Sequence, residues 1–151
     1  MDRIASFSVD HDKIVPGMYI SRIDGDVTTF DLRTRTPNAG DYMDNVTMHT
    51  VEHMLATLLR GGEIGEHVIY FGPMGCRTGF YLLTRDVEPA RVLAVLKRAL
   101  ADTVCFEGEV PGASQKECGN YRELSLEAAK KEAARYLAVL EEHKGDFSYD
   151  E

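Results

Sequence analysis

Two histidines and a glutamate stand close together in the segment His49-Thr50-Val51-Glu52-His53. On an α-helix, residues three and four positions apart share one face, so both imidazoles could meet one ion with the carboxylate beside them. Neutral imidazole nitrogens are common ligands of divalent metals, and a nearby carboxylate can move a proton on a bound substrate. The pattern therefore predicts a metal site on a helix.

Two histidines leave a metal ion short of ligands, because structural zinc takes four protein ligands and catalytic zinc takes three. Cys105 lies between Val104 and Phe106 and is predicted to be a small buried side chain. Cys76 and Cys118 each lie beside a glycine in segments without long apolar periodicity. If both bind, the site is a closed structural zinc site. If only one binds, the other is a free thiol near a Lewis acid, and the spacing leaves both alternatives open.

The helix that would carry the two histidines is well marked in the sequence. Apolar residues recur at helical spacing over about 45–60, with Asp44 as a suitable N-cap and Gly61 just past the end. A second helix is predicted from Pro89, because proline is tolerated in a first turn. A third is predicted over about 125–143, beginning at a serine N-cap.

The remaining regular structure is predicted to be strand. Residues 18–35 alternate polar and apolar side chains on either side of Asp24-Gly25-Asp26, which indicates a hairpin. Residues 67–71 and 79–84 are apolar stretches joined by a segment rich in glycine, and they indicate paired strands. Strands mixed with segregated helices favour an α+β fold, with helices packed on an antiparallel sheet.

Length and composition limit the classes of protein. A chain of 151 residues with 44% hydrophobic content is expected to form a single domain, 1–151. The net charge of −8 argues against nucleic acid as a partner. No apolar run approaches the roughly 20 residues needed to cross a membrane. The start of the chain lacks the features of a secretory signal, and three widely spaced cysteines suit a reducing compartment, so we expect a cytoplasmic protein. The polar, acidic segment 141–151 is expected to fray.

Several short motifs together carry a resemblance to a known family. In chain order they are Ser6-Phe7 with Asp10-His11, Phe30-Asp31-Leu32-Arg33 with Pro37-Asn38, the histidine motif, Pro73-Met74-Gly75-Cys76, and Cys118-Gly119. Their combination, order and spacing resemble the LuxS family of S-ribosylhomocysteine lyases over nearly the whole chain. One departure is Tyr70, where some relatives carry an acidic residue.

The resemblance implies a ligand set and a reaction. His49, His53 and Cys118 would hold one divalent metal, natively Fe²⁺ with Zn²⁺ or Co²⁺ able to replace it, and Cys76 would stay free. The substrate would be S-ribosylhomocysteine, cleaved to homocysteine and 4,5-dihydroxy-2,3-pentanedione, the precursor of the autoinducer-2 signal. The resemblance also implies a homodimer with active sites at the subunit interface. Ser6, His11 and Arg33 match positions that contact the substrate in the family.

The reaction needs groups that move protons, which the candidate residues can supply. Cys76 would shuttle protons between adjacent carbons while the carbonyl moves along the ribose, and Glu52 would act as the base for the final β-elimination. Glu52 could instead orient a ligating imidazole without touching substrate.

Two other functions fit parts of the pattern. The histidine motif occurs in metalloproteases of the H-x-x-E-H type, although these are usually much larger and take a distant carboxylate as third ligand. A binding module stapled by zinc through His49, His53, Cys76 and Cys118 would have no catalytic role, and chelation should unfold it.

Overall fold

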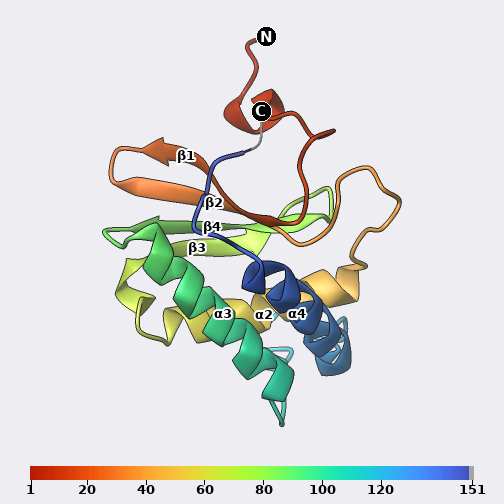
Figure 1. The fold of residues 1–151 in the computed structure, drawn as a ribbon. Helices are drawn as coiled ribbons and strands as arrows, with labels where there is room; N and C mark the ends of the chain where they lie inside the picture. Colours follow the sequence, from red (N-terminus) through yellow and green to blue (C-terminus); the bar gives the residue numbers. More distant parts are fainter. Residues whose placement is uncertain (150–151) are drawn as a thin grey trace.

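Four antiparallel strands form one sheet in the computed structural model, which describes residues 1–149. β1 (Gly17–Asp24) and β2 (Val27–Arg33) form one hairpin, and β3 (Val68–Pro73) and β4 (Gly79–Arg85) form a second. The hairpins join through β2 and β4, so that the strand order is β1-β2-β4-β3 (Figure 1). The predicted α+β class and both predicted strand pairs are confirmed.

The first hairpin is closed by a tight turn. Asp24 pairs with Val27, which leaves two residues in the turn. Gly25 has a φ of +62°, a left-handed conformation that residues with a Cβ rarely adopt. Farther along, the register of β1 shifts between Ile20 and Arg22, which marks a bulge in this edge strand. The turn sets the pairing, and the bulge bends the strand near its middle.

Three long helices cover one face of the sheet. They are α2 (Asn45–Arg60), α3 (Pro89–Cys105) and α4 (Leu126–Glu141). The short α1 (Ala5–Ser8) and the end of the described chain lie on the opposite face (Figure 1). A 3₁₀-helix, η1 (Gly65–His67), leads from α2 into β3. The predicted helices are confirmed, although α4 ends at Glu141, two residues earlier than predicted. Within residues 1–149, no helix combines the length and the apolar character needed to cross a membrane.

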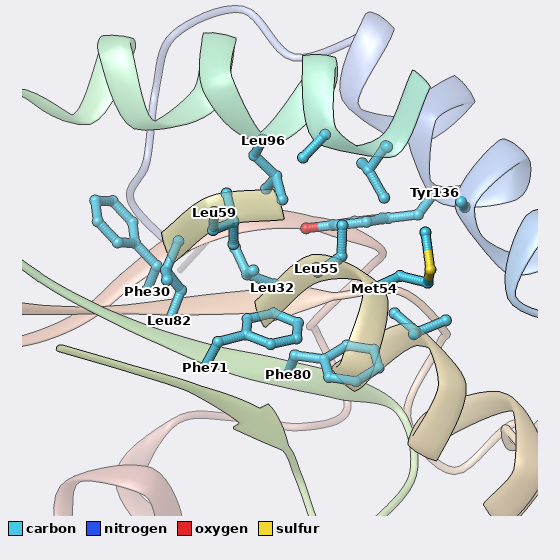
Figure 2. Packing of buried hydrophobic residues seen from close by; sticks show 14 of the residues in the cluster. Phe30, Leu32, Met54, Leu55, Leu59, Phe71, Phe80, Leu82, Leu96 and Tyr136 are labelled. Carbon is cyan, nitrogen blue, oxygen red and sulfur yellow. The ribbon is translucent and has the colours of Figure 1, made fainter. Parts of the chain in front are cut away.

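The core lies between the sheet and these helices (Figure 2). Phe71 and Phe80 stack with ring centroids 5.2 Å apart, and Leu55 of α2 packs into the same cluster. Tyr136 of α4 is fully buried, and its hydroxyl donates a 2.8 Å hydrogen bond to the carbonyl of Gly17. Burial raises the pKa of Tyr136 well above its ordinary value, so the hydroxyl stays a donor. This packing holds α2, the helix with the two histidines, firmly against the sheet.

Two predictions about the chain were wrong. Cys105 is exposed rather than buried. Thr103 is buried on the inner face of α3, and a residue two positions later lies about 200° around the helix, toward solvent. The segment predicted to fray instead packs against the sheet over residues 142–149, where the Ile20 amide donates a 2.7 Å hydrogen bond to the Phe147 carbonyl; residues 150 and 151 of that prediction lie outside the described residues. Phe147 also packs against the core, which its polar neighbours in sequence concealed.

Candidate functional site

The helix α2 places His49, Glu52 and His53 at one edge of the molecule. Asp44 caps the helix by accepting a 2.7 Å hydrogen bond from the Thr47 amide. The residues that α2 buries against the core occupy another face of the same helix, and the three site residues are left half-buried beside a loop. The helical periodicity that buries the core face therefore also gathers the histidine motif on one accessible face.

Backbone carbonyls fix the orientation of both imidazoles. Nδ1 of His49 lies 2.9 Å from the Glu123 carbonyl, and Nδ1 of His53 lies 2.8 Å from the Pro111 carbonyl. A carbonyl oxygen can only accept, so each Nδ1 carries the proton in the neutral ring and each Nε2 presents a lone pair. Ligating histidines in metal sites are usually held by such contacts.

The sulfur of Cys118 lies directly in front of the two free imidazole nitrogens. It is 3.4 Å from Nε2 of His49 and 3.7 Å from Nε2 of His53, and the three atoms all lie within 4.8 Å of one another. Tetrahedral zinc with ordinary N and S bond lengths separates such atoms by about 3.5 Å. The three residues therefore fit a metal ion, and the structure brings together the three predicted ligands.

A long loop between α3 and α4 carries Cys118 to this position. The Cys118 amide donates a 3.0 Å hydrogen bond to the Ser114 carbonyl, and the Asn120 amide donates to the sulfur at 3.4 Å. The loop passes close to His53 at Gly112, where φ is +72° and an added Cβ would lie 3.2 Å from the imidazole Nδ1. The site thus depends on an irregular segment that packs onto α2.

Glu52 lies between the two histidines in sequence and shares their face of α2. Its side chain is half-buried, and it makes no hydrogen bond or ion pair with any residue in the range 1–149. A carboxylate that is committed neither to a cation nor to an imidazole is available to act on a bound molecule.

Cys76 stands apart from the three metal-binding candidates. It lies in the connection from β3 to β4, and within the described residues it is not part of the His49, His53 and Cys118 group. Its sulfur is 3.0 Å from the Thr78 hydroxyl and 4.0 Å from Nη1 of Arg33. A closed structural zinc site with Cys76 as its fourth ligand is therefore not favoured.

Arg33 is held by a buried ion pair on the sheet face opposite the helices. Its Nε and Nη2 donate to the two carboxylate oxygens of Asp31 at 3.0 and 2.7 Å, and Nη1 donates to Thr78 at 2.9 Å. Asp31 and Arg33 are both 2% exposed, although they alternate with the core residues of β2. Burial lowers the pKa of Arg33, but the hydrogen bonds and charge of Asp31, with smaller contributions from Cys76 and Tyr149, raise it overall.

Ser6 of α1 lies on the same outer face as this ion pair. It lines a pocket with Tyr70 and Tyr81, and it hydrogen-bonds Tyr81. Burial, followed by the charge of Asp31, raises the pKa of Tyr81. The position of Tyr70, where the chain departs from the family pattern, therefore lies in the wall of this pocket.

His11 is not joined to these residues. Its Nδ1 lies 2.9 Å from the Val9 carbonyl, and none of its hydrogen bonds within residues 1–149 reaches Arg33 or Cys76. The structure thus brings Ser6, Arg33 and Cys76 toward one outer face of the sheet and leaves His11 in the neighbouring N-terminal segment.

Sequence analysis missed several polar residues around Arg33. The guanidinium donates hydrogen bonds to Asp31 and Thr78. Tyr149 donates a hydrogen bond to Asp31, and the charge of Asp31 contributes to raising the pKa of Tyr81. A signal existed for Asp31, because two opposite charges at alternate positions of one strand share one face of the sheet. No signal in the sequence joined Tyr149 to a strand more than a hundred positions earlier.

An antiparallel α+β fold whose helix and loop bring together two histidines and one cysteine that could hold a metal ion fits the class of small metal-dependent enzymes. The chain belongs to the LuxS family, whose sequence model, described as S-Ribosylhomocysteinase (LuxS), matches residues 4–146.

Curated relatives agree with this family. One from Borreliella burgdorferi (strain ZS7), named S-ribosylhomocysteine lyase, is 45% identical over 146 residues that cover 93% of each chain. A relative of the same name from Finegoldia magna is 44% identical over 145 residues, covering 93% of this chain and 92% of its own. Another from Desulfotalea psychrophila is 45% identical over 143 residues, covering 91% and 90%.

Proposed function

We propose that this chain is an S-ribosylhomocysteine lyase that releases homocysteine and 4,5-dihydroxy-2,3-pentanedione, the autoinducer-2 precursor. One observation carries the proposal. Two imidazoles, each oriented by a backbone carbonyl, aim their free nitrogens at the sulfur of Cys118, while Glu52 stands uncommitted on the same helix face. The family and the names of the relatives supply the substrate.

His49, His53 and Cys118 are the residues that would hold one divalent metal ion. The resemblance to the LuxS family implies iron(II) as the native metal, and zinc or cobalt could replace it because a site of nitrogen and sulfur ligands accepts each of these ions. When bound, the metal supplies Lewis acidity that stabilises negative charge on the oxygens of the sugar.

Proton transfer on the ribose is assigned to Cys76. In each round its thiolate would take a proton from one carbon and return it to the neighbouring carbon, while the hydroxyl proton passes to the former carbonyl oxygen; two rounds move the carbonyl from C1 through C2 to C3. The guanidinium of Arg33, 4.0 Å from the sulfur, places a fixed positive charge beside that thiolate. Ser6, His11 and Arg33 are the proposed contacts to the polar substrate.

The final step is assigned to Glu52. With the ketone at C3, the carboxylate removes the proton from C4. The electron pair forms a C4–C5 double bond as the C5–S bond breaks, and homocysteine leaves as its thiolate. The enol that remains tautomerises to the dione. Glu52 suits this role because no other described group holds its carboxylate.

We further propose that the protein works as a homodimer with its sites at the interface. The sheet face opposite the three long helices supports this arrangement. Ile4, which precedes α1, and Phe7 of α1 are 56% and 71% exposed, and Tyr70 on β3 is 50% exposed. Large exposed apolar side chains on one face mark interaction surfaces. Sedimentation at micromolar concentration tests it, and a strictly monomeric active enzyme would refute it.

The reaction itself is tested by measuring homocysteine release from S-ribosylhomocysteine with anaerobically purified protein, before and after chelation. Metal content and circular dichroism are measured on the same sample. Release that depends on about one metal per chain, with the fold kept after chelation, supports the lyase. A metal-loaded protein that releases nothing, and that unfolds on chelation, would instead be the zinc-stapled binding module.

A further inference from the structure

The end of the chain crosses to the outer side of the sheet and lies against β1 (Figure 1). The Phe147 carbonyl accepts the 2.7 Å hydrogen bond from the Ile20 amide, next to the bulge of β1. The Phe147 ring contacts Phe30 edge-on with centroids 6.3 Å apart, and it also contacts the His143 ring at 4.7 Å. These contacts anchor the segment at Phe147, two residues before Tyr149.

Tyr149 uses both parts of its side chain. Its ring stacks on Tyr19 with centroids 4.8 Å apart and an interplanar angle of 16°. Its hydroxyl donates a 2.7 Å hydrogen bond to Oδ2 of Asp31. Burial, followed by the negative charge of Asp31, raises the pKa of Tyr149, so the hydroxyl remains a protonated donor at neutral pH.

The oxygen that accepts from Tyr149 is the one that also binds Arg33. Oδ2 of Asp31 takes the Nη2 hydrogen bond at 2.7 Å, while Oδ1 takes Nε at 3.0 Å. A buried ion pair keeps a fixed geometry only when its remaining lone pairs are also satisfied. Tyr149 therefore completes the shell of the carboxylate that aims the guanidinium at Thr78 and at the Cys76 sulfur.

We propose that Tyr149 is a positioning residue, whose hydroxyl holds Asp31 and thereby fixes the Arg33 guanidinium beside Cys76. The inference rests on the proposed function, in which Arg33 and Cys76 serve the lyase reaction. It assigns a role in the site to the end of the chain.

The substitution Tyr149→Phe tests the role, because it keeps the ring stack on Tyr19 and removes only the hydroxyl. We expect kcat/KM for homocysteine release to fall roughly tenfold, the effect of losing one hydrogen bond to a charged group. We also expect alkylation of Cys76 by iodoacetamide at pH 7 to slow severalfold, since a displaced guanidinium favours the reactive thiolate less. Peptide mapping separates Cys76 from the exposed Cys105. Ser148→Ala is the matched control, and it should leave both rates unchanged.

Alkylation separates positioning from a structural role and needs no substrate. A merely structural tyrosine would lower the melting temperature but leave the alkylation rate of Cys76 in the folded protein unchanged. A chain shortened after Ser148 provides a second variant, and it should slow alkylation at least as much. Unchanged kinetics and unchanged alkylation in Tyr149→Phe would overturn the inference. If the unaltered protein released no homocysteine, the proposed function would fail, and the alkylation result would still decide whether Tyr149 positions Arg33.

Discussion

Nδ1 of His49 lies 2.9 Å from the backbone carbonyl of Glu123, 74 positions later in the chain. Because a backbone carbonyl supplies this contact, no side-chain substitution at Glu123 removes it. The ring is held with its Nε2 lone pair facing the site by the path of the loop itself. A change to a ligand should therefore affect metal binding without loosening the loop.

Replacing a metal-binding candidate should abolish metal retention and keep the fold. We expect Cys118→Ser to lower bound metal from about one per chain to a small fraction, since serine is a poor ligand for these ions. Homocysteine release should fall with it. Metal analysis and circular dichroism check both parts. Full metal content in purified Cys118→Ser would remove this residue from the ligand set.

Substitution of Glu52 separates a base from an orienting group. Glu52→Gln keeps the shape and hydrogen-bonding capacity of the side chain but cannot take a proton. If Glu52 is the base, turnover should fall by roughly 10²–10⁴ while metal content is unchanged. Steady-state kinetics on metal-loaded protein make the comparison. Near-normal turnover would refute the role of Glu52 as the base.

Cys76 and Cys105 should respond very differently to the same change. Cys76→Ala removes the proposed proton carrier, so turnover should be lost by about 10²-fold or more with metal retained. Cys105→Ala changes an exposed thiol at the end of α3 and should leave turnover unaltered. Equal activity of the two variants would contradict the proposed role of Cys76.

The two Asp–Arg pairs of the first hairpin offer a matched test of burial. Asp31 and Arg33 are buried, whereas Asp24 and Arg22 form an exposed pair at the same sequence separation. Asp31→Asn leaves a buried guanidinium uncompensated, so the free energy of unfolding should fall by about 3 kcal/mol. Asp24→Asn should change it little, because water screens the exposed pair. Urea denaturation of the two variants measures the free energy of unfolding of each, and equal losses would contradict this account.

The Asp44 cap makes helix α2 sensitive to acid. Hydrogen bonds from Thr47 hold the pKa of Asp44 below its usual value of 3.8. A depressed pKa means that the carboxylate stabilises the fold fully above the unfolded value, and that this contribution is lost as the pH falls through the lower folded value. Asp44→Ala should thus cost about 1 kcal/mol at pH 7 and progressively less below about pH 3.8.

Asp44→Asn provides the control for this prediction. Asparagine keeps an acceptor oxygen for the Thr47 amide but carries no charge, so its cost at pH 7 should be smaller than that of alanine and should also shrink in acid, while the difference between the two variants stays independent of pH. Urea denaturation of the three proteins at several pH values measures the difference. A cost of Asp44→Ala that stays constant down to pH 3 would show that the carboxylate charge contributes nothing.

The sequence predicted best where periodicity and local chemistry agree. The helix over 45–60 carries an apolar stripe and a side-chain cap, so both its ends and the shared face of His49 and His53 followed directly. The cysteine that joins them could not be chosen by spacing. Cys118 lies in a loop without periodicity, and its position depends on contacts with α2 that form only in the fold.

Other errors came from weighing neighbours in sequence above position in space. Cys105 has apolar neighbours, but the turn of α3 carries it to the solvent side. The end of the chain is polar on average, yet Phe147 and Tyr149 are two anchors among solvated residues. An average of polarity over a window of residues conceals single packed side chains that lie between exposed ones. The buried ion pair of Asp31 and Arg33 on the outer sheet face could not be predicted from the sequence, because its hydrogen-bond partners come from three separate segments of the chain.

The hydrogen bond from the Ile20 amide to the Phe147 carbonyl also bears on solubility. β1 is an edge strand, and the unpaired amides of an edge strand are a template onto which a strand of another molecule can add. Because the chain's own terminal segment occupies part of that edge, it competes with any intermolecular strand. Loss of these last residues would therefore open the edge of the sheet to aggregation.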